Sequence, residues 1–324
     1  MIVNCPGLFD LQVNGFAGTD FNAPDLTSDA LSDALDRLRR TGVTRCLPTL
    51  ITSSYDDFAR NARIVARHTH PAIAGIHMEG PYLSPDDGPR GAHPRQHVRA
   101  ASIDDFNRRQ DAADGRIVLV TLAPEVPGAL PLVEHLAASG VRVAIGHSAA
   151  PPPQIGDAIA AGATMATHLG NGCAQHLPRH PNIIWELLAA DTLCASLIAD
   201  GHHLPPPTVK VMVRAKGPHR TILVTDAVAA AGCRPGRFSI GGVETVLGED
   251  GRVSLPGTPY LAGSSLTLDR AIANVSRFTG LSLDEIVPMA SSIPAAYLGM
   301  TPAGTVTLDW DPDGCALSVR RVTS

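Results

Sequence analysis

The sequence lacks the features that mark secreted, membrane-spanning and nucleic-acid-binding proteins. Its six cysteines are scattered and form no CxxC pair, which is typical of reduced thiols rather than of a disulfide scaffold. No apolar run approaches the roughly 18 to 20 residues that a membrane helix needs, and no signal peptide precedes the first predicted strand. The net charge of −5 argues against a nucleic-acid partner. We therefore expect a cytoplasmic protein with no membrane or nucleic-acid partner.

The sequence does contain a regular alternation of apolar and helical segments. With 44% hydrophobic residues, the chain of 324 residues can bury a large core. Leu31, Leu35 and Leu38 have helical spacing, and the segments 152–162 and 206–217 begin with proline and end with glycine, as helices do. Strand-like apolar runs lie at 8–14, 43–51, 73–79, 116–123, 141–147, 163–169, 194–200 and 220–226.

Eight nearly continuous apolar strands with intervening helices predict an α/β fold, a (β/α)8 TIM-type barrel over residues 1–300. A doubly wound open sheet is the alternative, but no GxGxxG follows the first strand. Turn residues in "RFSIGGVETVLGEDGRVSLPG" predict a β insertion at about 233–258, and the tail predicts a β hairpin at 301–324. The segment 81–101 is rich in proline, glycine and charge, so we expect a loop over a site.

Polar side chains stand at the ends of these strands, where a barrel of this kind holds its chemistry. Two histidines and a glutamate supply the nitrogen and oxygen ligands of a catalytic metal, so Glu79, His147 and His168 form a candidate metal triad. The spacing alone leaves open that the histidines are structural. The polar strand-end residues are Gln12, Asn14, His77, Glu79, His147, His168, Asp200, His202, His203 and Asp226.

Six motifs follow one another along the chain: "HMEGPYLSPDDGPRGAHP", "GHS", "THLGNG", "ADGHH", "LVTDA" and "LAGSSLTLDRAIANV". In this order, over residues 6 to about 300, the chain resembles N-acetylglucosamine-6-phosphate deacetylases of the amidohydrolase superfamily. The resemblance implies hydrolysis of the N-acetyl amide of N-acetylglucosamine 6-phosphate to the free amine and acetate. It implies one divalent metal ion at the triad, zinc first, with iron, manganese or cobalt as alternatives. Asp226 would be the general base and acid, and His203 would polarise the substrate carbonyl. A helix cap is the structural alternative for Asp226.

Gln12 and Asn14 share one face of the first strand, where two buried amides need hydrogen-bond partners. Many amidohydrolases carry His-x-His at these places and bind a second metal ion there. Because amides are poor zinc ligands, the resemblance implies a one-metal site with both second-metal positions vacated. We expect the amides to form hydrogen bonds within the cavity; the alternative is that neighbouring backbone satisfies them.

The resemblance also implies contacts with the amino-sugar substrate and its phosphate. Arg179, Asn171 and Gly172 match the family's phosphate contacts, and His93 in "RGAHP" matches another substrate contact. Some of these contacts come from a neighbouring subunit in the family, which implies a homodimer. His77, two residues before Glu79, is either a support for the metal ligands or a packing residue.

Two departures from the family pattern keep other functions open. "NGC" follows "THLG", and "QHLPRHPNIIWELLA" replaces a glycine-rich continuation, so the substrate could be another N-acyl amino sugar. The chain also has a short segment before its first barrel strand, which implies a reduced β-sandwich domain, with 301–324 as its remnant, or a wrong start site. The alternatives are hydrolysis of another amide (an unphosphorylated N-acyl sugar or a cyclic imide) and a non-catalytic protein that binds a metal or a sugar phosphate.

Overall fold

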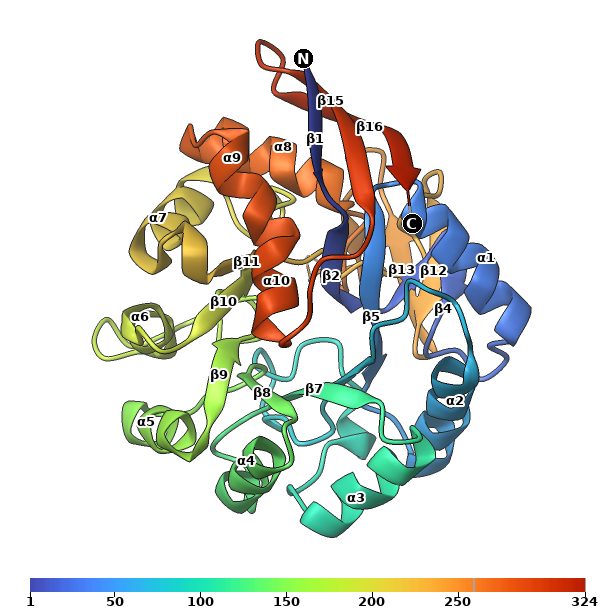
Figure 1. Ribbon diagram of the computed structural model, residues 1–324. Helices are drawn as coiled ribbons and strands as arrows, with labels where there is room; N and C mark the ends of the chain where they lie inside the picture. Colours follow the sequence, from blue (N-terminus) through green and yellow to red (C-terminus); the bar gives the residue numbers. More distant parts are fainter. Residues whose placement is uncertain (259, 324) are drawn as a thin grey trace. The chain divides into compact units, whose positions relative to one another are not determined.

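The computed structural model describes residues 1–258 and 260–323 of the chain (Figure 1). Residues 259 and 324, which fall within the predicted barrel and hairpin ranges, lie outside the described residues. The chain divides into two compact units. The first unit comprises residues 1–49, 68–74 and 197–324, and the second comprises residues 50–67 and 75–196.

The second unit is built on parallel strands that follow one another in sequence order. They are β6 (Ile76–Glu79), β7 (Ile117–Leu122), β8 (Arg142–Ile145), β9 (Ala163–Ala166) and the greater part of β10 (Cys194–Leu197). One row of the sheet pairs Glu79 with Thr121, Thr121 with Ala144, and Ala144 with Met165. His147 and His168 each stand three residues beyond this row, so the register brings both to the level just past Glu79.

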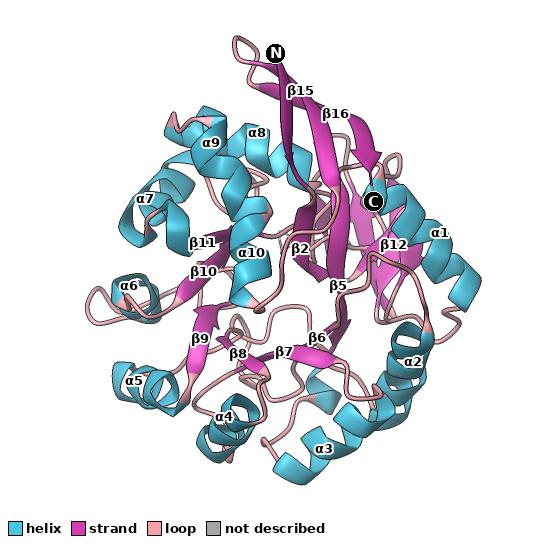
Figure 2. Ribbon diagram, viewed as in Figure 1, coloured by secondary structure: helices cyan, strands magenta, loops and turns pink. Residues whose placement is uncertain are grey.

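Helices cover the outer side of these strands (Figure 2). They are buried on one side only, which the sequence shows as apolar residues at helical spacing. Proline at the start and glycine at the end bound the predicted helix at 152–162, which the structure confirms as α5 with Gly162 at its end. The helices of this unit are α2 (Tyr55–Arg67), α3 (Ile103–Ala112), α4 (Ala129–Ala138), α5 (Pro152–Ala161) and α6 (Ile183–Ala189).

The first unit holds the strands from both ends of the barrel sequence. β2 (Leu8–Val13) pairs in parallel with β5 (Val43–Ile51), and β11 (Thr221–Leu223) is followed by a bridge between Val13 and Ala227. Its helices are α1 (Ser28–Arg39), α7 (Pro206–Lys216), α8 (Leu268–Thr279), α9 (Leu283–Ile286) and α10 (Ser292–Tyr297). The predicted helix at 31–38 is confirmed as α1, which buries all three of its leucines.

Small antiparallel sheets accompany the parallel strands of the first unit. β15 (Thr305–Asp311) and β16 (Ala316–Thr323) form a hairpin, and β1 (Ile2–Pro6) pairs with β15 as a third strand beside it (Figure 1). β12 (Gly236–Ile240), β13 (Val243–Leu247) and β14 (Val253–Ser254) form a sheet within the range of the expected β insertion. A short hairpin of β3 (Gly15–Phe16) and β4 (Thr19–Asp20) follows β2.

The fold is thus a (β/α)8 barrel with a small antiparallel β domain, and the predicted fold class is confirmed. Several strands are shorter than the apolar runs that predicted them, because β8, β9 and β11 end before His147, His168 and Asp226. These three residues have positive φ angles, which an extended strand does not allow. No helix among the described residues has the length and apolar character that crossing a bilayer requires.

Candidate active site

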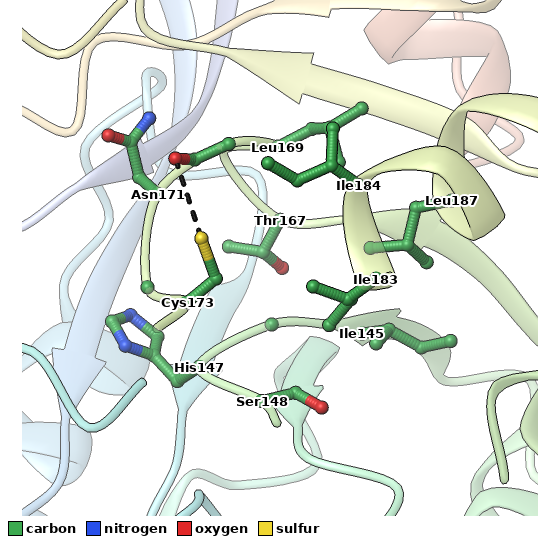
Figure 3. Close-up of a pocket in the computed structure, with 13 residues that line it drawn as sticks. Ile145, His147, Ser148, Thr167, Leu169, Asn171, Cys173, Ile183, Ile184 and Leu187 are labelled. Carbon is green, nitrogen blue, oxygen red and sulfur yellow. Dashed lines mark hydrogen bonds between the residues drawn. The ribbon is translucent and has the colours of Figure 1, made fainter. Parts of the chain in front are cut away.

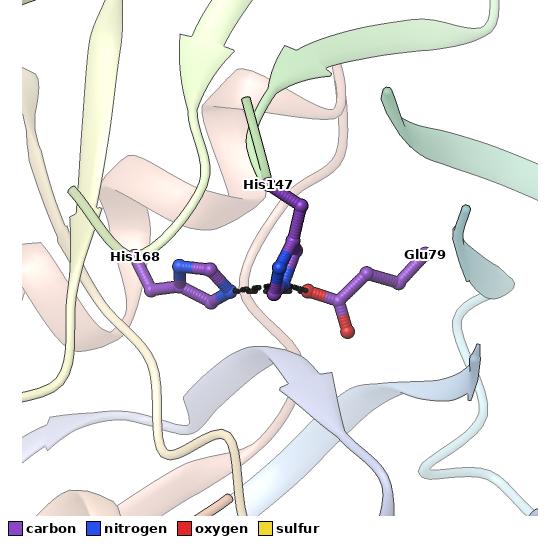
Figure 4. A group of neighbouring side chains, drawn as sticks. All are labelled: Glu79, His147 and His168. Carbon is purple, nitrogen blue, oxygen red and sulfur yellow. Dashed lines mark hydrogen bonds and ion pairs between the residues drawn. The ribbon is translucent and has the colours of Figure 1, made fainter. Parts of the chain in front are cut away.

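The three residues of the candidate metal triad converge in the second unit (Figure 4). The Nε2 atoms of His147 and His168 lie 3.1 Å apart, and they lie 3.2 and 3.1 Å from Oε1 of Glu79. All three side chains are buried, and they come from the ends of different strands. Three atoms that can each donate a lone pair to a cation therefore face one point.

This arrangement fits a divalent metal ion. Bonds of about 2.0 to 2.1 Å place neighbouring ligand atoms of a tetrahedral zinc about 3.3 Å apart, close to the three separations observed. Nδ1 of His147 donates a hydrogen bond to the carbonyl oxygen of Pro89 at 2.9 Å. That bond puts the ring proton on Nδ1 and leaves the Nε2 lone pair directed at the triad, as a metal-binding histidine requires.

Two glycines lie so close to the His147 ring that a side chain at either position would crowd it. A Cβ atom at Gly172 would lie 2.9 Å from Nδ1 of His147, and one at Gly91 would lie 3.1 Å from Cε1. Both glycines have a φ of +57°. Gly91 belongs to the loop that the sequence predicted to cover a site, so this loop and the turn at Gly172 form a cradle for one metal-ligand candidate.

His93 places a third imidazole ring next to the buried triad. Its Nε2 atom lies 3.2 Å from Nε2 of His147, and its Nδ1 atom lies 3.0 Å from Oγ1 of Thr52. Burial, and then the neighbouring His147, lower the pKa of His93 to about 3, so its ring is neutral at pH 7. Burial alone would raise the pKa of Glu79, but the neighbouring imidazoles of His147 and His168 outweigh burial and hold the pKa of Glu79 well below its ordinary value. The buried group therefore contains an ionised carboxylate at Glu79 and a neutral imidazole at His93.

A chain of buried polar side chains lies beneath the triad. Nε2 of His77 lies 2.8 Å from Oγ1 of Thr121, which lies 2.7 Å from Oγ1 of Thr167. Thr121 pairs with Glu79 in the sheet, and Thr167 precedes His168. His77 therefore contacts Thr121, the sheet partner of Glu79, and is linked to Thr167, next to His168, through the Thr121 hydroxyl.

Asp226 is the hydrogen-bond partner of the two buried amides, Gln12 and Asn14. In the first unit, Nδ2 of Asn14 and Nε2 of Gln12 donate hydrogen bonds to Oδ1 of Asp226, at 2.6 and 3.1 Å. Gln12 lies on β2 and Asn14 directly follows this strand, and the backbone N–H of Asp226 donates to the carbonyl oxygen of Gln12 at 3.0 Å. The orientation of the Asp226 carboxylate is thereby fixed by side chains as well as by the backbone.

Asp10 stands on β2, two residues before Gln12, and interacts electrostatically with Asp226. Its carboxylate accepts hydrogen bonds from Oγ1 and the backbone N–H of Thr225, at 2.6 and 3.2 Å. Burial raises the pKa of Asp10 to about 7, and hydrogen bonds from Thr225 and Gln12 only partly oppose this effect. Sequence reasoning gave Asp10 no role, although its place in an apolar run beside Gln12 and Asn14 is a signal for one.

His203 forms a close pair with Asp200 in the first unit. Nδ1 of His203 lies 2.7 Å from Oδ2 of Asp200, and Oδ1 of Asp200 accepts the backbone N–H of both His202 and His203 at 2.8 Å. Burial works to raise the pKa of Asp200, but the contacts with His203 and the backbone N–H of His202 together outweigh burial and lower the pKa. The imidazole of His203 is held by a carboxylate at one nitrogen, while His202 reaches the carbonyl oxygen of Asp250 instead.

The expected phosphate contacts lie after β9 in the second unit. The N–H of Asn171 donates to the carbonyl oxygen of His168 at 2.9 Å, so Asn171 and Gly172 form a tight turn beside the triad. Arg179 is exposed in the loop before α6. Among the described residues, no hydrogen bond or ion pair joins its side chain to the triad, so the expectation for Arg179 rests on its register in the sequence.

A pocket beneath this turn is too small for a sugar (Figure 3). Apolar side chains of β8, α6 and the segment after β9 line it together with His147 and Cys173, and its volume is about 10 Å³. A cavity needs about that volume to hold one water molecule. The pocket therefore belongs to the packing between the sheet and α6 rather than to a substrate site.

The chain belongs to the amidohydrolase family, whose model matches residues 3–318. Within that family, the relatives it resembles are deacetylases of phosphorylated amino sugars. N-acetylglucosamine-6-phosphate deacetylase of Bacillus subtilis is 34% identical over 322 residues, which cover 95% of this chain and 78% of the relative. The human enzyme of the same name is 35% identical over 326 residues, with the same coverage. N-acetylgalactosamine-6-phosphate deacetylase of Escherichia coli O157:H7 is 33% identical over 305 residues, which cover 91% of this chain and 78% of the relative.

Solved structures show the same relationship. N-acetyl-D-glucosamine-6-phosphate deacetylase of Mycobacterium smegmatis superimposes with a TM-score of 0.91 at 32% identity, over 99% of this chain and 86% of that chain. A mutant of that enzyme in complex with N-acetyl-D-glucosamine-6-phosphate gives a TM-score of 0.90 at 31% identity, with the same coverage. The predicted resemblance to this family is therefore confirmed.

Proposed function

We propose that this protein is a metal-dependent deacetylase that hydrolyses the N-acetyl amide of N-acetylglucosamine 6-phosphate to the free amine and acetate. The observation that carries the proposal is the convergence of Glu79, His147 and His168, in a chain about one third identical to deacetylases of this kind. The six free thiols suit the reducing cytoplasm, where we place the enzyme.

Glu79, His147 and His168 would hold one divalent cation, zinc first, with iron, manganese or cobalt as alternatives. When bound, such an ion polarises the amide carbonyl and makes water acidic enough to supply the nucleophile near neutral pH. Gln12 and Asn14 stand at the vacated second-metal positions. Their amide N–H groups already donate to Asp226, which supports a site with one ion rather than two.

Asp226 would act as general base and acid. Its carboxylate takes a proton from the attacking water and returns it to the departing amine nitrogen, and the two amide donors hold it in one orientation meanwhile. His203 would stabilise the developing oxyanion through Nε2. The Asp200 carboxylate, 2.7 Å from Nδ1, holds the ring in one orientation and leaves Nε2 as the nitrogen for the substrate.

The substrate contacts extend from this centre. We assign His93, Asn171 and Gly172 to the sugar and its phosphate, and Arg179 to the phosphate, because a guanidinium group binds two phosphate oxygens at once. The exposure of Arg179 suits a contact made to a neighbouring subunit, so we propose that the enzyme works as a homodimer. Its other partner is the small amino-sugar substrate.

The test combines metal analysis with acetate release from the purified protein. We expect about one divalent ion per chain, and we expect Asp226→Asn to lower kcat by roughly 10²- to 10⁴-fold, the usual contribution of a general base. Asp33→Asn, which removes the same charge from an exposed position on α1, is the control and should leave kcat unchanged. Acetate release that survives in Asp226→Asn would remove the proposed base.

The substrate screen should include both epimers and the unphosphorylated sugar. The Escherichia coli relative carries the name of an N-acetylgalactosamine-6-phosphate deacetylase at a similar identity, so this epimer is the second candidate substrate. We expect N-acetylglucosamine 6-phosphate to give the highest kcat/KM. Turnover of unphosphorylated N-acetylglucosamine or of a cyclic imide at the same rate would favour an amidohydrolase for another amide, and metal or sugar-phosphate binding without turnover would indicate a non-catalytic binding protein.

A further inference from the structure

A carboxylate from another loop holds the two residues that follow His147. Glu125 lies between β7 and α4, outside the candidate metal triad. Its Oε2 atom accepts a hydrogen bond from Oγ of Ser148 at 2.8 Å, and its Oε1 atom accepts one from the backbone N–H of Ala149 at 2.6 Å. Both oxygens of one carboxylate are thus used on adjacent residues of the His147 loop. Such charge-assisted bonds are stronger than bonds between neutral groups.

The backbone at His147 needs this support. His147 has a φ of +51°, in the left-handed region that residues with a side chain rarely adopt. Ser148, which is buried, is fixed from two further directions: its N–H donates to the carbonyl oxygen of Gly172 at 3.1 Å, and its Oγ accepts the N–H of Ala150 at 3.0 Å. Glu125 therefore completes a network that fixes the chain on the C-terminal side of His147.

The direction of the His147 ring follows from that backbone. Nδ1 can reach the carbonyl oxygen of Pro89, and Nε2 can reach Glu79 and His168, only while the Cα–Cβ bond keeps its present direction. Metal ligands must be held to within about half an ångström of their working positions. A change of φ at residue 147 moves Nε2, at the far end of the side chain, by more than it moves the backbone.

We propose that Glu125 is a positioning residue that sets the metal affinity of the site through Ser148 and His147. The inference rests on the proposed function, because it takes the triad to be a metal centre. Glu125 touches neither the triad nor a substrate-contact candidate, and it borders a cavity of about 270 Å³ between α4 and α5. Water in that cavity can replace a lost carboxylate oxygen of Glu125. A substitution of Glu125 therefore does not leave the hydrogen-bond donors of Ser148 and Ala149 buried without a partner.

The experiment compares Glu125→Gln with Glu134→Gln, an exposed glutamate on α4 that loses the same charge. The glutamine oxygen can accept one of the two hydrogen bonds, while its NH₂ group faces the other donor. Zinc affinity is measured on the metal-free proteins by competition with a chromogenic chelator. We expect Glu125→Gln to bind zinc about 10- to 100-fold more weakly, the usual effect of losing a group that supports a metal ligand, and Glu134→Gln to match the wild type.

Ser148→Ala provides an independent test, since it removes the hydroxyl donor and leaves the carboxylate in place. It should weaken zinc binding in the same direction, and the double variant should be no weaker than Glu125→Gln alone, because both changes break one network. The visible spectrum of the Co²⁺-loaded proteins reports ligand geometry and should change in both variants.

The outcomes separate this inference from the proposed function. A wild-type protein that binds no divalent ion overturns both. A wild type that binds zinc and releases acetate, together with Glu125→Gln and Ser148→Ala variants whose zinc affinity and Co²⁺ spectrum equal those of Glu134→Gln, overturns the role of Glu125 alone. A lower melting temperature without a change in zinc affinity also overturns that role, since it assigns Glu125 to folding only.

Discussion

A methyl group added at Gly172 should weaken metal binding without unfolding the protein. In Gly172→Ala the new Cβ atom lies 2.9, 3.1 and 3.2 Å from three ring atoms of His147, whereas carbon atoms in contact normally lie about 3.5 to 4.0 Å apart. The ring must therefore move by about half an ångström. The atom approached most closely is Nδ1, so the hydrogen bond to Pro89 is lost or lengthened. The Nε2 atom moves with the ring.

The size of the effect can be worked out with a matched control. Gly172 has a φ of +57°, and alanine in the left-handed region costs about 1 to 2 kcal/mol wherever it occurs. Gly140, at the end of α4, has a φ of +76°, but a Cβ atom there meets nothing within 4 Å. Gly140→Ala should therefore lose a similar free energy of unfolding and no metal affinity. Displacement of a ligand should add a loss of about 10- to 100-fold in zinc affinity, or roughly 1.4 to 2.8 kcal/mol, in Gly172→Ala only.

Chelator competition on metal-free protein measures this difference. Because no substrate is present, the result does not depend on the contact that Gly172 is proposed to make with the phosphate. Urea unfolding of both variants measures the shared backbone cost. Equal zinc affinities for Gly172→Ala and Gly140→Ala would refute the reasoning that the glycine is needed to make room for His147.

Three further predictions concern the first unit and the phosphate contact. Asn14→Ala removes the 2.6 Å donor to Asp226 and should lower kcat about tenfold, as expected for a bond to a charged group worth about 1.5 kcal/mol, with metal content unchanged; a loss of metal would contradict it. Burial raises the pKa of Asp10 from 3.8 to about 7, so the stability that its proton confers is complete below about pH 4 and is lost as the pH rises through 7. Relative to Asp10→Asn, the wild-type free energy of unfolding should fall by up to about 4 kcal/mol over that range in urea titrations, and a constant difference would show that Asp10 does not titrate there. Arg179→Ala should raise KM for the phosphorylated sugar at least tenfold and leave KM for the unphosphorylated sugar unchanged; a KM for the phosphorylated sugar that equals the wild-type value would show that Arg179 does not bind phosphate.

Much of the candidate metal site could be predicted because parallel strands impose a simple rule. Their C-terminal ends meet at one edge, so residues far apart in the sequence, such as Glu79 and His168, come together if each stands at a strand end. The eight apolar runs located those ends to within a few residues. The exact strand limits could not be predicted, because the sequence does not show that His147 and His168 leave the strand through positive φ angles.

The partners of the two buried amides could be narrowed down but not identified from the sequence. Alternation along the predicted strand at 8–14 put Gln12 and Asn14 on one face, and their burial required hydrogen bonds. Only the three-dimensional structure shows that one carboxylate oxygen, Oδ1 of Asp226, accepts from both. The supporting contacts of Pro89, Thr52 and Glu125 were missed for the same reason, since they depend on loop geometry that no periodic pattern encodes.

The third strand of the terminal sheet, β1, also could not be predicted from the sequence. β1 is short, and most of its residues are exposed or half-buried, so it has no clear alternation of apolar and polar positions. Its pairing with β15 depends on residues about 300 positions away. The hairpin of β15 and β16 was easier to predict, because its turn residues lie between two apolar runs that are adjacent in the sequence.

The left-handed backbone at His147, His168 and Asp226 restricts which side chains these positions can carry. Apart from glycine, histidine, aspartate and asparagine are the residues that tolerate such angles best. Ligand chemistry at these strand ends can therefore be exchanged among imidazole, carboxylate and amide at little conformational cost. Cysteine or a β-branched residue would meet a backbone penalty before any metal is bound. Re-engineering this centre for thiolate-preferring metals would thus have to begin with the loops, and only then turn to the ligands.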